Sequence, residues 1–213
     1  DIAGDIYIGG GESEAMRLVA QAAHILQKRY PNIHYHLYSG NADDVGERLD
    51  KGLLDFGILI EPFDRKKYDS LRLPVRERWG VLMRKDSPLA DCDYITPDDL
   101  KDKPLLHSRQ SKVQDGIQAW FGYDIEELNI VGTYNLLYNA SLMVEEGVCY
   151  ALCLDKLINT TGDSNLCFRP LINQVTAGID LVWKKYQVFS KAADKFLEIM
   201  REQMIPHENG TLP

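Results

Sequence analysis

The sequence predicts an α/β protein of two lobes, because short apolar strands alternate with amphipathic helices along most of its 213 residues. The connections between these elements are short, which favours parallel strands joined by right-handed crossovers. The alternation starts again near Trp79 after a charged and proline-containing stretch. We therefore expect a first lobe before this position and a second lobe after it.

The first lobe follows a strand–helix–strand–helix–strand order. Pro31 ends the first expected helix, and Gly52 ends the second. The expected strands are 6–9, 33–38 and 55–60, and the expected helices are 16–26 and 45–51.

Two polar and glycine-rich loops, residues 10–13 and 39–43, follow the first two expected strands. In open α/β sheets, ligands bind outside the carboxyl ends of the strands, where helix N-termini present unpaired N–H groups. The same residue types also cap helices without any ligand. From the residues alone, ligand binding and simple capping both stay open for each loop.

The second lobe repeats the plan. A strand at 79–83 is followed by Thr96 and Pro97, which mark the start of a short helix, and a later helix ends at Gly147. The further expected strands are 104–107, 129–133, 150–154, 166–171 and 179–184, and the further helices are 113–121, 136–146 and 192–204. Residues 206–213 show no periodicity, so we expect a frayed tail.

The charge of the chain argues against direct binding of nucleic acid, since the formal net charge is -8 and the pI is about 5.1. The densest basic run, Arg65-Lys66-Lys67, indicates a solvated turn. The sequence has no apolar run long enough for a membrane span, and we expect no signal peptide before Asp1. We expect a soluble cytoplasmic chain.

Metal and cofactor sites are not predicted. His34 and His36 share one face of a strand, but a third ligand is missing. The cysteines show no pair or cluster at zinc spacing and are expected to be reduced: Cys92, Cys149, Cys153 and Cys167.

Five motifs occur in a characteristic order: the opening strand at 6–9, then residues 28–33, 49–58, 84–89 and 143–148. With these motifs, residues 4–204 resemble the effector-binding domain of LysR-type transcriptional regulators. The resemblance implies a type 2 periplasmic-binding-protein fold, in which two α/β lobes are joined by two crossing strands. Lobe I would comprise residues 1–77 plus 180–213, and lobe II residues 78–179.

Some positions differ from the family pattern. Tyr150 replaces a glycine that is common after the Gly147 turn, and Asp155 replaces a proline that often ends the next strand. The family's N-terminal helix-turn-helix has no counterpart, and the chain starts without Met. We therefore expect a regulatory domain taken from a longer regulator, which contacts DNA only through the missing domain.

In the family that this chain resembles, the effector lies between the lobes, and assembly as a homodimer or tetramer is usual. The resemblance implies a small-molecule effector bound by loop residues of both lobes. These ligand-binding candidates are Gly11, Glu12, Ser13, Asn41, Ala42, His107, Ser108, Arg109, Asn135 and Asn139.

The chemistry of these candidates suggests an organic acid or an amino-acid-like effector. Ser13 at a helix N-terminus and the guanidinium of Arg109 suit a carboxylate, whereas Glu12 suits an ammonium group. In the alternative interpretation, Glu12 faces solvent and Arg109 pairs with Asp99 or another surface acid.

Two other functions compete with effector sensing. A solute-binding protein of a membrane transporter would share the fold but needs a secretory signal or lipid anchor. An enzyme on the same frame is disfavoured, because Ser13, His107 and Asp155 occur without a motif that places a nucleophile and a base together. We predict no catalytic residues.

Overall fold

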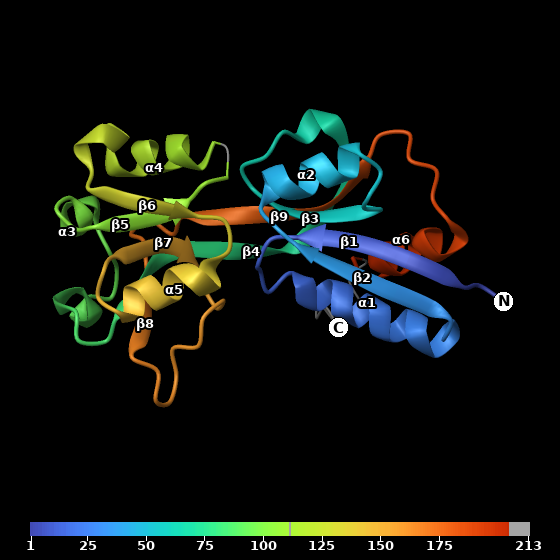
Figure 1. The fold of residues 1–213 in the computed structure, drawn as a ribbon, viewed down its shortest axis with the longest axis horizontal. Helices are drawn as coiled ribbons and strands as arrows, with labels where there is room; N and C mark the ends of the chain where they lie inside the picture. The colour runs from blue at the N-terminus through green and yellow to red at the C-terminus, as the bar shows by residue number, and fades with distance from the viewer. Residues whose placement is uncertain (111, 205–213) are drawn as a thin grey trace. The chain divides into compact units, whose positions relative to one another are not determined.

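The structure, a computed structural model, describes residues 1–110 and 112–204 (Figure 1). The chain divides into two compact units: unit 1 contains Asp1–Val75 and the chain from Gly178 onward, and unit 2 contains Arg76–Ala177. The chain enters unit 2 within β4 (Tyr68–Arg84) and returns within β9 (Thr176–Lys184). The predicted two-lobed α/β fold is confirmed. Position 111 and the tail predicted to fray lie outside the described residues.

Unit 1 is built on a mixed sheet with β1 (Gly4–Gly10) in a central position. β1 is parallel to β2 (Ile33–Ser39) on one side and to β3 (Phe56–Ile60) on the other. β9 pairs antiparallel with β3. The expected parallel strands of the first lobe are therefore present, and their carboxyl ends share one edge.

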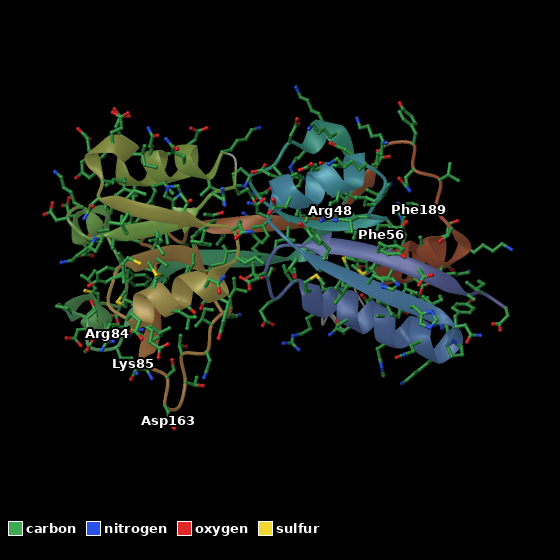
Figure 2. All side chains as sticks on the ribbon, in the orientation of Figure 1. Arg48, Phe56, Arg84, Lys85, Asp163 and Phe189 are labelled. Carbon is green, nitrogen blue, oxygen red and sulfur yellow. The ribbon has the colours of Figure 1, made fainter. Side chains whose placement is uncertain are left out.

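Helices cover both faces of the unit 1 sheet (Figure 1). α1 (Met16–Arg29) and α6 (Lys191–Gln203) pack side by side in one apolar cluster with Ile58 of β3, while α2 (Ala42–Asp50) packs in another with Leu59. Successive strand residues point to opposite faces, so both faces of the sheet are buried. Phe56 stacks on Phe189 at a ring-centroid distance of 4.9 Å in the first cluster (Figure 2).

Unit 2 has its own sheet, in which β5 (Leu105–Ser108) lies parallel to β6 (Ile130–Tyr134) and β7 (Tyr150–Leu154). The unit 2 part of β4 pairs antiparallel with β7 and also with β8 (Leu166–Pro170). The parallel strands again bring their carboxyl ends to a common edge.

Two helices enclose the unit 2 sheet. α4 (Val113–Phe121) contributes Phe121 to the cluster that contains Val81, and α5 (Leu137–Glu145) packs in the cluster that contains Leu82. The shorter elements are α3 (Pro97–Leu100) and the 3-10 turns η1 (Arg65–Lys67), η2 (Pro88–Asp91) and η3 (Ile125–Glu127).

Several predicted helix ends are confirmed. Gly52 and Gly147 follow α2 and α5 with φ angles of 70° and 80°, a conformation that glycine adopts without strain. Thr96 caps α3 by accepting a hydrogen bond from the Asp99 N–H at 3.3 Å. Local turn chemistry is therefore sufficient to end these helices.

Several predicted boundaries are wrong, including the starts of β1 at Gly4 rather than residue 6 and of β9 at Thr176 rather than residue 179. The strand expected at 79–83 begins at Tyr68 and runs through Pro74, which has no N–H to donate and stands outside the pairs with β7 and β8. α2 begins at Ala42 rather than Val45, because Asn41 caps it, so the expected loop residue Ala42 is helical. Among the described helices, none is long and apolar enough to cross a membrane.

Candidate functional site

The loops that follow β1 and β2 touch each other in unit 1. The Gly40 N–H donates to the Gly10 carbonyl at 3.0 Å, which joins the two strand ends. A Cβ atom at Gly11 would lie 3.2 Å from Ile60 Cδ1 and 3.6 Å from the Gly40 carbonyl oxygen. Gly11 thus keeps the backbone of these loops close together.

Ser13 lies in the turn that precedes α1, whose N-cap residue is Ala15 without a side-chain cap. Ser13 is only 9% exposed, and its Oγ accepts a hydrogen bond from the Ala15 N–H at 2.9 Å. The neighbouring Glu12 is partly buried rather than fully solvated. This loop therefore places one hydroxyl and one carboxylate near a helix N-terminus.

Asn41 makes a complete capping box with Asp44. Its Oδ1 accepts from the N–H groups of Asp43 and Asp44, both at 3.0 Å, and the Asp44 carboxylate accepts from the Asn41 N–H at 3.2 Å. The capping interpretation is confirmed here. Capping uses the oxygen of the side-chain amide, whereas its NH₂ group is a hydrogen-bond donor.

The loops that follow β5 and β6 are joined in unit 2 by the Arg109 N–H, which donates to the Tyr134 carbonyl at 2.8 Å. His107 is buried, and its Nδ1 lies 2.8 Å from the Ser108 carbonyl, which fixes the ring with a proton on Nδ1. Ser108 Oγ accepts from the Gln110 N–H at 3.2 Å. The backbone of this loop is thus held by its own side chains.

The other unit 2 candidates are exposed. Arg109 presents its side chain to solvent, and the Asp99 carboxylate instead accepts from the Thr96 N–H at 2.8 Å and its hydroxyl at 2.9 Å. Asn135 lies in the loop after β6, and Asn139 lies in the first turn of α5. The candidates of each unit therefore lie in its loop pair or, for Ala42 and Asn139, in the first turn of the helix that follows.

An ion-pair cluster in unit 1 was missed by the sequence analysis. Asp180 of β9 is 1% exposed and pairs with Arg65 and with Arg72, whose Nε is 2.7 Å away. Both arginines also reach Glu61, at 2.5 Å and 2.7 Å. The solvated turn predicted at 65–67 is present and exposed, but the ion pairs of Arg65 with Asp180 and Glu61 were not predicted. The available signal was a single aspartate within an apolar strand, because a buried charge needs partners.

The cluster changes the acidity of Glu61. Burial opposes its ionisation, but hydrogen bonds from Arg72, the Gly178 N–H and Arg65 outweigh burial and lower the pKa of Glu61 to about 2. A carboxyl with a lowered pKa stabilises the fold above its ordinary pKa and loses this contribution as the pH falls toward the lowered value. The relevant window is pH 4.5 to 2.

We expect Glu61→Gln to lower the free energy of unfolding by about 1 kcal/mol at pH 7, because the side chain is partly exposed and solvent screens its ion pairs. The difference from the original chain should shrink below pH 4.5 and vanish near pH 2. Urea unfolding across this pH range measures the difference in the free energy of unfolding, and the substitution Glu198→Gln at the surface is the control. A difference that stays constant with pH would contradict the assignment.

Among residues 1–110 and 112–204, no group of three or more His, Cys, Asp or Glu side chains gathers to hold a metal ion. His36 instead lies 2.8 Å from an Asp5 carboxylate oxygen and stacks on Tyr7 at 4.6 Å.

Similar proteins are transcriptional regulators. The chain is 26% identical over 211 residues to the HTH-type transcriptional regulator YvbU of Bacillus subtilis (strain 168), covering 93% of this chain and 67% of YvbU. It is 24% identical to the hca operon transcriptional activator HcaR of Escherichia coli (strain K12), with 93% and 68% covered. The chain thus spans about two thirds of the length of these curated relatives. The transporter alternative receives no support from them.

Solved structures share the fold. HinK, a LysR family transcriptional regulator from Pseudomonas aeruginosa, matches with a TM-score of 0.75 at 20% identity, covering 96% of this chain and 72% of HinK. The effector binding domain of QuiR in complex with shikimate matches with a TM-score of 0.78 at 17% identity, covering 93% and 96%. The sequence model of the LysR substrate binding domain matches residues 1–205, so the chain belongs to this family of regulatory domains of LysR-type transcriptional regulators.

Proposed function

We propose that the chain senses a small-molecule effector and passes the signal to DNA-binding domains of the same regulator. The family match supports this role, and the loop pair at the carboxyl ends of the parallel strands is the observation that carries it. Each unit has such a pair, one after β1 and β2 and the other after β5 and β6. Each pair is a candidate effector-binding surface of its own unit in this proposal.

The signal is a shift between two arrangements of the units. A ligand shifts such an equilibrium only by its difference in affinity for the two states, at most a few kcal/mol. The chain binds its effector without converting it, acts in the cytoplasm, and reaches DNA only through the attached domain. Its relatives are regulators that extend beyond the matched region, which supports this assignment.

The proposed effector carries a carboxylate. The hydroxyl of Ser13, the amide NH₂ of Asn41 and the guanidinium of Arg109 are all donor groups that match a carboxylate. The QuiR domain, which shares the fold, was solved in complex with shikimate, an organic acid. Glu12 adds a negative charge beside Ser13, which favours an effector that also carries an ammonium group.

Calorimetric titration with amino acids and simple organic acids tests the ligand class. We expect saturable binding of a compound with a carboxylate, and tighter binding when an amine is present. If acids bind equally well without an amine and Glu12→Gln leaves the affinity unchanged, the amine part is wrong. If none of these compounds binds, the carboxylate class itself is wrong.

We expect Asn41→Ala to weaken binding of the identified effector about tenfold, because a donor to the carboxylate is lost. Loss of the cap also costs about 1 kcal/mol of stability, so affinity is measured well below the melting temperature of the variant. Asn41→Asp keeps the capping oxygen but removes the NH₂ donor and adds a negative charge. It should retain stability and still lose affinity; unchanged affinity would contradict a contact through the amide.

We also propose a homodimer, as the family resemblance implies. Light scattering at several protein concentrations measures the molar mass in solution. A mass that stays at 24.2 kDa at high concentration would contradict the proposal for this chain.

A further inference from the structure

Unit 2 contains a polar pocket of about 480 Å³ that involves none of the proposed effector residues. Its wall combines the unit 2 part of β4, η2, β8 and the segment after β7, so every lining residue belongs to unit 2. Figure 2 labels Lys85 beside the end of β4, on the side from which β8 and the loop with Asp163 extend. The charged lining residues are Arg78, Lys85, Asp91, Asp155 and Arg169.

Arg169 is fixed in this wall by the main chain. Its Nε and Nη2 donate to the Ala90 carbonyl at 3.0 Å and 2.8 Å, and its Nη1 donates to the Phe168 carbonyl at 2.7 Å. These carbonyls hold the guanidinium in place but carry no formal charge to neutralise it. The side chain is therefore a rigidly placed cation.

The hydrogen bonds of Arg169 also determine which N–H donors of its guanidinium remain for a ligand. A guanidinium has five N–H donors in a planar fork. The three bonds to Ala90 and Phe168 use the Nε side and one hydrogen of each terminal nitrogen. One N–H on Nη1 and one on Nη2 remain, and donors on the two terminal nitrogens of a guanidinium can match two oxygens of a carboxylate or phosphate.

The remaining charges on the wall favour an anion of low charge. Arg78 is paired with Asp155 at 2.7 Å, which leaves Lys85 as a second cation of the lining and Asp91 as its other acid. Thr160 adds a hydroxyl. The lining thus carries three cations against two carboxylates, an excess of positive charge.

We propose that this pocket binds a small oxyanion, a carboxylate or a phosphate group, held in a bidentate contact by Arg169 and attracted by Lys85. The site is separate from the loops assigned to the effector, so its occupation would be a second input to the same domain. A carboxylate and a phosphate group both present two oxygen atoms that share a delocalised negative charge.

Titration with sodium phosphate and with sodium acetate, both at constant ionic strength, tests the site. Amide chemical shifts measured by NMR should saturate and change most in β8 and η2. We expect Lys85→Gln to weaken binding about fivefold, the range of a partly solvated charge pair. Saturation with acetate alone identifies a carboxylate site, and saturation with phosphate alone identifies a phosphate site.

The control is Lys185→Gln, which makes the same charge change at an exposed position in unit 1. Arg169→Lys keeps the charge but removes the fork, and should lose binding more strongly, provided that circular dichroism shows an intact fold. The proposal is wrong if neither anion saturates, if the shifts lie outside the pocket, or if Lys185→Gln weakens binding as much as Lys85→Gln.

Discussion

Gly80→Ala is expected to destabilise unit 2 by about 3 kcal/mol, the upper part of the range for inserting atoms into a packed interior. Gly80 lies in β4 between Cys153 of β7 and Pro170 of β8. A Cβ atom there would lie 2.2 Å from the Phe168 ring and 2.4 Å from the carbonyl oxygen of Arg169. The ring can shift, but the carbonyl belongs to the paired strand β8, so relief requires a movement of the backbone.

Urea unfolding followed by circular dichroism and tryptophan fluorescence measures this loss. Gly116→Ala is a matched control, because Gly116 lies within α4 and its added Cβ meets no atom within 4 Å beyond its chain neighbours and the backbone of its own helix. Alanine is the better helix former, so this control should gain about 0.5–1 kcal/mol. Equal effects of the two changes would contradict the packing described around Gly80.

The elements of the fold were largely predictable, because each depends on a local pattern. The strand at 150–154 and the helix at 113–121 have the predicted bounds, and Gly147 ends α5 as expected. Hydrophobic periodicity and turn residues act within a few positions of the chain. β4 was harder to predict for two reasons. It contains Pro74, and proline normally interrupts a strand. The strands with which β4 pairs also cannot be identified from neighbouring residues in the sequence.

The turn contacts of the candidate loops were equally local: the capping interpretation holds for Asn41, whereas Ser13 stabilises the turn before α1 and the N-cap residue of that helix is Ala15. Side-chain partners far apart in the sequence were not predictable. Arg65 and Asp180 are separated by 115 positions, and the Arg169 guanidinium binds a carbonyl 79 positions away. Such contacts depend on how strands pair, which one sequence does not specify.

The second large effect is expected for Asp180→Asn, which should lower the free energy of unfolding by about 2–3 kcal/mol. Removing one member of a buried ion pair typically costs about 3–5 kcal/mol, because the partner charge is left uncompensated. Here Arg65 and Arg72 are 42% and 45% exposed, so water and Glu61 partly compensate them and the loss is smaller. Asparagine has the size of aspartate, which excludes a packing effect.

Asp163→Asn is the control, since Asp163 is exposed in the loop before β8 and the same chemical change there should leave stability unaffected (Figure 2). A double-mutant cycle with Arg65→Gln separates the ion pair from other effects. Because Arg65 contacts the carboxylate directly, Arg65→Gln should cost much less in the Asp180→Asn background than in the original chain. Additive losses would show that the buried carboxylate acts without Arg65 and would contradict the cluster as the reason for a charge within β9.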